Sequence, residues 1–194
     1  MSYYDQKTQP QGAAQVEKKS TGLGMLIDIF QTVLLALVFY FLIDLAFARV
    51  RVENISMQPT LAEGEYLIVN KLAYRFGEMH TGDVVVFHYT VSEDYVKRLI
   101  GLPGDHIEIY DGKVFVNGIA LDEPYIAAAP HYTGAWDVPA QSVFVLGDNR
   151  NQSSDSHRWG FLAADQIVGK ALVVYWPLSE MKLLTDGLVV HANP

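Results

Sequence analysis

Cysteine is absent from the 194 residues, so the chain forms no disulfide and offers neither a thiolate zinc site nor a cysteine nucleophile. Clustered basic residues are missing too. The formal net charge is -8, whereas a protein that binds nucleic acid needs grouped Lys and Arg to neutralise phosphates. The six histidines are scattered without the paired spacing typical of metal ligands. We therefore expect no nucleic-acid partner, no metal and no cofactor.

Long apolar runs are also scarce, and the one exception is residues 23–47. As a helix this run would extend about 37 Å, against a hydrocarbon core of roughly 30 Å. Its two charges, Asp28 and Asp44, would be about 24 Å apart, which places each near a membrane interface. A cleaved secretory signal is the alternative, but its apolar stretch is typically about 7–15 residues and ends at a small-residue cleavage site. We expect a retained transmembrane helix over 23–47.

The rest of the chain divides into a polar tail and a region of strand-like patterns. Residues 1–22 lack hydrophobic periodicity, which predicts a disordered tail. Beyond residue 47, short β-branched and aromatic runs alternate with turn signals. The expected strands are 50–53, 66–69, 83–89, 95–100, 107–110, 113–116, 142–146 and 171–176. Residues 48–194 are therefore predicted to form a mostly β, compact barrel-like domain.

Smaller features complete this prediction. The dipeptides Asp111-Gly112 and Asn117-Gly118 predict tight hairpin turns. The segment 126–141, with Ala, Pro and aromatic residues, is interpreted as a long surface loop. A brief helical periodicity occurs near 162–167.

Ser56 lies in the stretch Asn-Ile-Ser-Met-Gln-Pro-Thr-Leu, residues 54–61, directly after a predicted strand. Pro59 fixes its own φ and biases the preceding residue away from helix, so the chain is predicted to turn sharply after the serine. A hydroxyl at such a turn can be exposed beside backbone N–H groups, as an oxyanion hole requires. An ordinary turn serine is the alternative, since serine is common in turns.

Lys97 lies in a predicted strand whose other residues are apolar or aromatic on either face. Burial there would remove water from the ammonium group and lower its pKa. To act as a base near neutral pH, the lysine needs a pKa roughly three units below the usual value of about 10.4. A neutral lysine could then accept the proton of a serine hydroxyl. The alternative is a strand lysine whose head group reaches water.

The polar run 147–160 follows a buried strand and is dense in residues that hydrogen-bond backbone groups, which suits a scaffold that holds a site rigid. A solvated surface loop is the alternative. Within this run, His157 with Asp148 or Asp155 suggests a Ser-His-Asp triad. Because that triad leaves Lys97 and its apolar strand unexplained, we favour a pair of Ser56 and Lys97.

Four motifs in order resemble those of type I signal peptidases, the membrane-anchored Ser/Lys proteases that remove signal peptides from exported proteins. They are Ser-Met-Gln-Pro-Thr-Leu at 56–61, Gly-Asp-Val-Val-Val-Phe at 82–87, Tyr-Val-Lys-Arg-Leu-Ile-Gly-Leu-Pro-Gly-Asp at 95–105, and the run from Gly147 that opens Gly-Asp-Asn-Arg and contains Ser153, Asp155 and Ser156. The resemblance implies a single-pass plasma-membrane protein in which 1–22 is a cytoplasmic tail and 48–194 an extracytoplasmic β catalytic domain.

The resemblance also implies roles for individual residues. Ser56 would be the nucleophile and Lys97 the general base. Ser153 would hydrogen-bond and orient the lysine, and Asp155 would be a structural residue beside it. The implied substrate is a signal peptide with small residues, typically Ala, at the first and third positions before the cut.

Such a substrate can bind as an added β-strand, in which main-chain hydrogen bonds give affinity and alternate side chains enter pockets. The resemblance implies pocket-lining roles for six positions that equally suit a plain β core. These positions are Val52, Met57, Leu61, Val86, Tyr95 and Val96.

Two positions depart from the family pattern. Asn54 stands where some members carry a serine that completes the oxyanion hole, so its amide N–H could donate instead, or the backbone N–H of Ser56 could act alone. His157 follows Asp-Ser where the family usually has Arg, so the pairing expected for Asp155 is altered and sensitivity to pH is introduced.

Two other functions are compatible with parts of the sequence. Self-cleaving repressor-type peptidases also use a Ser/Lys pair, but they are soluble and attached to DNA-binding domains, against which the apolar run and the acidic charge argue. An inactive, anchored β domain would have lost Ser56 or Lys97, and both are present. The favoured prediction is a membrane-bound serine endopeptidase that cleaves signal peptides of exported preproteins, with the bilayer as its second partner.

Overall fold

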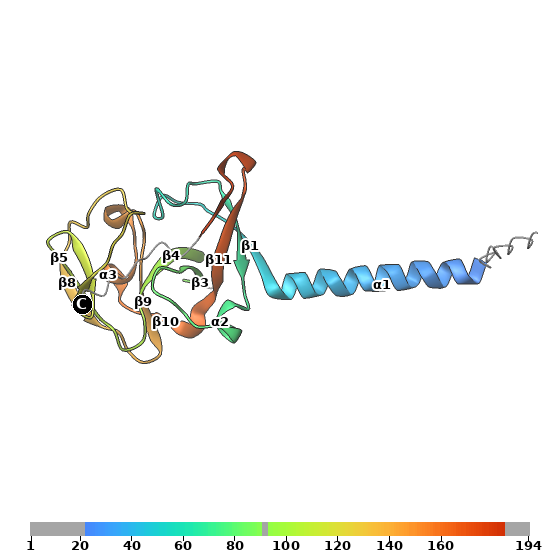
Figure 1. Cartoon of the computed structure of the whole chain (residues 1–194), viewed down its shortest axis with the longest axis horizontal. Coiled ribbons are helices and arrows are strands. Elements are labelled where there is room, and N and C mark those ends of the chain that lie inside the picture. The colour runs from blue at the N-terminus through green and yellow to red at the C-terminus, as the bar shows by residue number, and fades with distance from the viewer. Residues whose placement is uncertain (1–21, 91–92, 185–194) are drawn as a thin grey trace, which may run out of the picture. The chain divides into compact units, whose positions relative to one another are not determined.

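The structure is a computed structural model that describes residues 22–90 and 93–184 (Figure 1). The predicted disordered tail therefore lies, except for Gly22, outside the described residues. Backbone contacts divide the chain into two units, residues 1–41 and 42–194, which are described separately.

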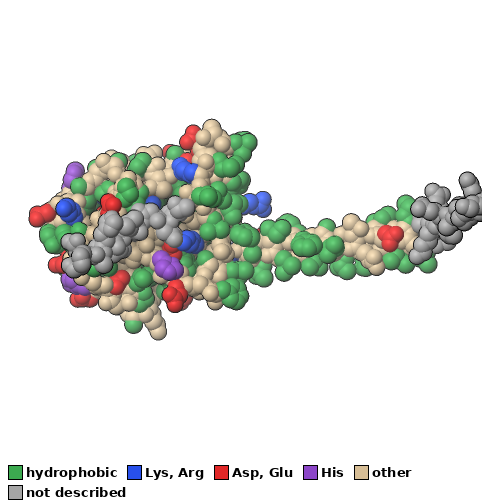
Figure 2. All heavy atoms as spheres, viewed as in Figure 1, with side chains coloured by type: hydrophobic (Ala, Val, Ile, Leu, Met, Phe, Trp, Pro, Cys, Tyr) green, Lys and Arg blue, Asp and Glu red, His purple; other side chains and the backbone are tan. Residues whose placement is uncertain are grey.

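One helix, α1 (Gly22–Ala46), is long and apolar enough to cross a membrane by its length and composition. No residue of this 25-residue helix is buried, and its Leu, Ile, Val and Phe side chains are exposed along its length (Figure 2). So large an apolar surface is unfavourable in water, which supports the prediction of a membrane span. The helix begins one residue earlier than predicted and ends one residue earlier, because Phe47 is already part of the first strand.

The last carbonyls of α1 are bound by Lys71, which lies in the same unit between the strand β2 (Tyr66–Asn70) and the short helix α2 (Ala73–Phe76). The backbone N–H of Lys71 donates to the carbonyl of Ala46 at 2.8 Å, and its ammonium group donates to the carbonyl of Asp44. The last carbonyls of a helix have no partner within the helix and carry its negative dipole end. Lys71 therefore supplies both a donor and a positive charge where the helix needs them.

The described residues after α1 are mostly strands. The strands are β1 (Phe47–Arg51), β2 (Tyr66–Asn70), β3 (Val84–His88), β4 (Asp94–Gly101), β5 (His106–Tyr110), β6 (Lys113–Val116), β7 (Ile119–Ala120), β8 (Gly134–Asp137), β9 (Ser142–Leu146), β10 (Leu162–Ala163), β11 (Ile167–Trp176) and β12 (Lys182–Leu183). Short helices are α2 (Ala73–Phe76) and α3 (Ser156–Trp159), with 3₁₀ turns η1 (Arg150–Gln152), η2 (Ala164–Gln166) and η3 (Leu178–Glu180). The prediction of a mostly β fold is confirmed.

Two antiparallel sheets make up the second unit. The main sheet has eight strands in the order β1-β2-β11-β3-β4-β9-β10, with β12 also paired to β11, and it curls as a barrel-like fold does (Figure 1). The second sheet has four strands in the order β7-β6-β5-β8. β3 and β4 lie in the middle of the main sheet, and β4 has a neighbouring strand on both sides from Arg98 onwards.

The predicted hairpin turns are present. Asp111 and Gly112 join β5 to β6 with φ of 50° and 71°, and Asn117 and Gly118 join β6 to β7 with φ of 52° and 80°. Positive φ at both central positions is what a two-residue hairpin turn needs, and Asn, Asp and Gly tolerate it best.

One local prediction was wrong and another was met only in part. The expected surface loop 126–141 contains β8, which pairs with β5 and places Trp136 against the ring of Phe144 at 4.9 Å. The brief helical periodicity near 162–167 corresponds in part to the 3₁₀ turn η2, with β10 before it and β11 after it. For β8, pairing with a distant strand outweighed a weak local pattern, since strand preference depends strongly on context.

The core consists of three clusters, one of which supports the turn that carries Ser56. That cluster includes Met57 and Leu61 from the turn itself, both almost fully buried. They pack with residues from β1's end, β2, β3, β4 and β11, namely Val52, Leu67, Val69, Val84, Val86, Val96, Ala171 and Val174. The turn is thus attached to the main sheet by apolar contacts on either side of the serine.

Candidate active site

Ser56 lies in the turn predicted from Pro59 and is only 7% exposed. Within the turn, the N–H of Leu61 donates to the carbonyl of Met57 at 2.9 Å. From outside, the backbone N–H of Asn149 donates to the carbonyl of Ser56 at 3.0 Å, and the Asn149 side-chain amide donates to the carbonyl of Ile55 at 3.1 Å. The serine is therefore fixed by a residue from the polar run that begins at Gly147.

Lys97 lies in β4, as predicted, and is 1% exposed. Its Nζ donates to Ser56 Oγ at 2.8 Å and to the carbonyl of Val96 at 3.0 Å, and it lies 5.1 Å from the centre of the Tyr95 ring. The structure thus brings together the two residues that the sequence singled out. Sequence could place the lysine in a strand, but only the fold places its ammonium group beside the serine hydroxyl.

Burial lowers the pKa of Lys97 to about 8. The nearby carboxylates of Asp155 and Asp148 act in the opposite direction and raise it. Desolvation disfavours the charged ammonium, and the two negative charges limit that effect. At neutral pH a useful minority of the molecules then carry a free amine, the form of lysine that can take a proton from a hydroxyl.

Asn54 directs its side-chain oxygen at Ser56. Asn54 Oδ1 accepts from the backbone N–H of Ser56 at 3.1 Å and from Ser56 Oγ at 2.6 Å. The first of these bonds is an Asx turn, in which an Asn side chain binds the backbone two residues ahead. Because a backbone N–H can only donate, the atom facing it must be the oxygen and not the amide nitrogen. The Ser56 hydroxyl therefore accepts from Lys97 and donates to Asn54.

Ser153 and Asp155 lie in the same polar run but contact different groups. Ser153 is buried against Gly147, and its hydroxyl has no hydrogen-bond partner among the described residues. Asp155 accepts from the N–H of Gly147 at 2.9 Å and caps α3 through the N–H of His157. The expected hydrogen bond from Ser153 to Lys97 stays a prediction.

His157 takes the place at Asp155 that the family pattern gives to arginine. Its Nδ1 lies 2.5 Å from Asp155 Oδ1, its ring stacks on Tyr132 with centroids 3.9 Å apart, and its Nε2 accepts from Arg158 Nε at 3.2 Å. Among the described residues, the side-chain partners of Ser56 are Lys97 and Asn54 instead. The geometry therefore does not assemble a Ser-His-Asp triad. Nor do three or more His, Asp or Glu side chains converge on a metal-sized site anywhere in the described ranges.

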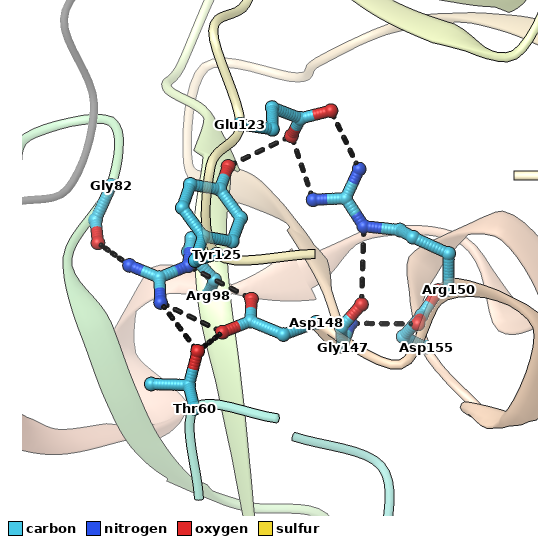
Figure 3. A network of polar contacts seen from close by, with 9 residues as sticks. All are labelled: Thr60, Gly82, Arg98, Glu123, Tyr125, Gly147, Asp148, Arg150 and Asp155. Carbon is cyan, nitrogen blue, oxygen red and sulfur yellow. Dashed lines mark hydrogen bonds and ion pairs between the residues drawn. The ribbon is translucent and has the colours of Figure 1, made fainter. Parts of the chain in front are cut away.

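A buried ion pair holds the β4 strand to the polar run (Figure 3). The guanidinium of Arg98 donates to both oxygens of Asp148 at 2.8 and 2.7 Å, and to the carbonyl of Gly82 at 2.7 Å. Thr60 Oγ1 donates to the same carboxylate at 2.5 Å. This pair connects the residue next to Lys97 with the turn that follows Ser56, so it fixes the two halves of the site against each other.

A second buried pair supports the start of the polar run (Figure 3). Arg150 donates to both oxygens of Glu123 at 2.9 and 2.7 Å, and its Nε donates to the carbonyl of Gly147 at 3.1 Å. Tyr125 donates to Glu123 at 2.8 Å, and its ring lies 3.8 Å from the Arg98 guanidinium. Arg98, Asp148 and Arg150 stood inside the recognised motifs, whereas Glu123 and Tyr125 carried no sequence signal.

A groove of about 700 Å³ lies between the end of β1 and the start of β4. It is lined by Arg49, Val50, Arg51, Val52, Glu53, Asn54, Met57, His88, Glu93, Asp94, Tyr95 and Val96. Four of the six predicted pocket residues belong to this lining, and the other two, Leu61 and Val86, are fully buried in the core beneath it. The start of β4 pairs with β3, whereas its pairing with β9 is found only from Arg98 onwards. One edge of the strand is thus free of β9 beside the groove.

Comparisons with known proteins agree with these features. A family model described as "Signal peptidase, peptidase S26" matches residues 26–176. The chain is 45% identical over 139 residues to a probable signal peptidase I-2 of Synechocystis sp., which covers 68% of this chain and 64% of that protein. It is 43% identical over 136 residues to signal peptidase I of Leptolyngbya laminosa (65% and 67% covered) and 44% identical over 149 residues to signal peptidase I of Bacillus caldolyticus (69% and 82% covered). The chain therefore spans slightly less than two thirds of the Synechocystis relative.

Proposed function

Because this chain belongs to the signal peptidase family S26, we propose that it is a membrane-bound serine endopeptidase that cleaves N-terminal signal peptides from exported preproteins after small residues. The observation that carries the proposal is the 2.8 Å contact between Lys97 Nζ and Ser56 Oγ. A buried lysine beside a serine hydroxyl is an arrangement in which a base other than histidine can activate the serine as a nucleophile.

In the proposed reaction, neutral Lys97 accepts the hydroxyl proton as Ser56 Oγ attacks the scissile carbonyl. The negative oxygen of the tetrahedral intermediate is bound by the backbone N–H of Ser56. The ammonium form of Lys97 then gives its proton to the leaving amine, which leaves an acyl ester on Ser56. Lys97 next deprotonates a water molecule that hydrolyses the ester. The carboxylates of Asp148 and Asp155 stabilise the ammonium formed in each half of the reaction.

The groove beside the dyad supports binding of an extended peptide. The start of β4, at Asp94–Val96, lacks a β9 partner, so a substrate strand can pair with its backbone. Val52, Met57 and Val96 supply apolar walls close to Ser56, and such walls suit small side chains. Alternate substrate residues would then enter the groove, which accounts for a preference at the first and third positions before the cut.

The proposed location is the plasma membrane, crossed once by α1, with residues 48–194 on the extracytoplasmic face. The absence of cysteine makes this orientation directly testable. With Lys113→Cys on exposed β6 and Thr8→Cys in the tail, a membrane-impermeant maleimide applied to intact spheroplasts should label only the first. Labelling of Thr8→Cys alone would reverse the proposed orientation.

Cleavage of a preprotein by the purified full chain in detergent tests the function. Ser56→Ala and Lys97→Ala should each abolish cleavage, whereas the exposed residues changed in Ser154→Ala and Lys113→Ala should leave it at the wild-type rate. The two control variants match the chemical change without touching the site. Equal cleavage by all five proteins would show that the dyad assignment is wrong, and no cleavage by any of them would count against a peptidase and favour an inactive, anchored β domain.

A further inference from the structure

Two groups compete for the single proton of the Ser56 hydroxyl. Asn54 Oδ1 lies 2.6 Å from Ser56 Oγ, and Lys97 Nζ lies 2.8 Å from it on another side. In the structure the hydroxyl donates to Asn54, which is the arrangement expected when Lys97 is a charged ammonium with three N–H donors and no lone pair. Two of those donors are used, by Ser56 Oγ and by the carbonyl of Val96.

We propose that Asn54 is a positioning residue that holds the hydroxyl proton of Ser56 away from Lys97 in the resting enzyme and so sets the pH above which Lys97 acts as a base. The inference rests on the proposed function, since it assigns Lys97 the role of base. It differs from the role of an oxyanion-hole donor, because the oxygen of Asn54, and not its N–H, faces the serine.

The physical link is that Asn54 is the acceptor left to the Ser56 hydroxyl when Lys97 is charged, because an ammonium group has no lone pair, whereas neutral Lys97 offers a second acceptor. Neutral Lys97 has a lone pair that can accept the Ser56 proton, but the hydroxyl must first turn away from Asn54. Deprotonating Lys97 into a reactive pair therefore breaks the 2.6 Å bond. A hydrogen bond on which the charged form depends more than the neutral form raises the pKa of the group.

Other charges around Lys97 do not involve Asn54. The carboxylates of Asp148 and Asp155, in the polar run after β9, act on the ammonium electrostatically. Tyr95 lies on the same strand, and the neighbouring Arg98 is bound by Asp148. A substitution at Asn54 leaves these groups in place. Since the Asn54 side chain is exposed, its replacement should also leave the fold intact.

The local conformation explains how the chain maintains this contact. An Asx turn requires only the bond from the Ser56 N–H to Asn54 Oδ1, and the spacing of two residues then brings the same oxygen within reach of the serine side chain. When the oxyanion forms, it needs that N–H. One rotation of the Asn54 side chain therefore frees both the backbone donor for the oxyanion and the hydroxyl proton for Lys97.

The test is the titration of Lys97 in the full-length protein in detergent, followed in two ways. One measurement is the pH dependence of kcat/KM for preprotein cleavage, which reports ionisations of the free enzyme. The other is the ¹³Cε chemical shift of labelled lysine, with the Lys97 signal assigned by its loss in Lys97→Met; it does not depend on cleavage. Asn54→Ala should lower both midpoints by about half a unit to one unit.

Two further variants separate the explanations. Asn54→Asp keeps the acceptor and adds a negative charge, so it should raise both midpoints. Asn149→Ala removes a different asparagine that holds the same turn through Ile55, so it should leave the midpoints unchanged even if the rate falls. A fall in rate for Asn54→Ala with both midpoints unchanged would overturn the inference and leave Asn54 a donor or a structural residue. If wild type cleaves no preprotein while the NMR midpoint still shifts in Asn54→Ala, the proposed function fails and the contact stands.

Discussion

Lys97 Nζ lies 2.8 Å from Ser56 Oγ although the two residues are 41 positions apart. The lysine reaches the serine from the middle of the main sheet, and the serine is supplied by a turn whose Met57 and Leu61 are buried in the same sheet's core. Apolar packing thus does two things at once. It holds the two groups at hydrogen-bond distance, and it removes the water that would keep the lysine charged.

The pH dependence of cleavage should follow the ionisation of Lys97. Because the pKa of Lys97 is lowered to about 8 and only the neutral amine is a base, kcat/KM should rise with pH and level off above pH 8. At pH 7 it should be roughly a tenth of its plateau value. Initial rates at substrate concentrations far below KM, from pH 6 to 9, measure this. A profile that is flat over this range would contradict the assignment, and Lys97→Arg should be inactive throughout.

Lys97 should destabilise the fold at neutral pH. Its folded pKa of about 8 lies below the unfolded value of about 10.4, so the unfolded chain binds more protons between these values and the free energy of unfolding rises with pH across that window. Below pH 8 the cost of burying the charge is present in full and amounts to about 3 kcal/mol. Lys97→Met should therefore melt at a higher temperature than wild type at pH 7.

The same comparison at higher pH provides the control for this effect. By about pH 10.5 the wild-type lysine is neutral in the folded protein and about half neutral in the unfolded chain, so most of the difference in Tm between wild type and Lys97→Met that comes from the buried charge should have disappeared. Because both proteins carry the same other lysines, comparing their Tm values at each pH removes the contribution of those lysines. A Lys97→Met variant that melts below wild type at pH 7 would be inconsistent with the lowered pKa.

The buried pair of Arg98 and Asp148 should be strongly coupled. Removing either partner leaves an unpaired buried charge, so Arg98→Met and Asp148→Leu should each lower the free energy of unfolding by about 3–5 kcal/mol. The double variant should cost much less than the sum of the two. Denaturant unfolding of all four proteins measures the coupling.

A surface pair offers the matched comparison. His88 and Asp94 lie 2.6 Å apart, but their side chains are 64% and 40% exposed. Solvent screening should keep the coupling of this pair within about 0–1 kcal/mol in the same double-variant experiment. If the losses in free energy of unfolding from Arg98→Met and Asp148→Leu simply add in the double variant, the Asp148 carboxylate must be satisfied without the arginine.

Gly147→Ala should impair cleavage. A Cβ atom at this position would collide with the hydroxyl of Ser153 and the backbone carbonyl of Ser56, so the turn or the polar run has to shift. A displacement of about 1 Å at the nucleophile can reduce the rate on the order of 100-fold. Gly118→Ala is the comparison: there the added Cβ meets nothing within 4 Å, so the positive φ of 80° should reduce stability but leave the cleavage rate unchanged. Wild-type cleavage by Gly147→Ala would show that the contact is not critical.

Much of the fold was predictable because its determinants are local. The turns at Asp111-Gly112 and Asn117-Gly118 follow from residues that tolerate positive φ, and the helix α1 follows from one continuous apolar run. The strand β8 was missed because it is short and its stability comes from pairing with the distant strand β5, where Trp136 lies opposite Ile107, 29 positions earlier in the chain.

The sequence by itself determined which residues could carry the chemistry: a serine before Pro59, a lysine in an apolar strand, and a polar run after β9. Tertiary structure alone decided which of them meet. Alternation along a strand tells which residues share a face, but it does not tell what covers that face. The contact of Ser56 with Lys97, the direction of the Asn54 oxygen and the Glu123–Arg150 pair all depend on sheet register and on loops that cross the sheet, and these are set by packing over the whole domain.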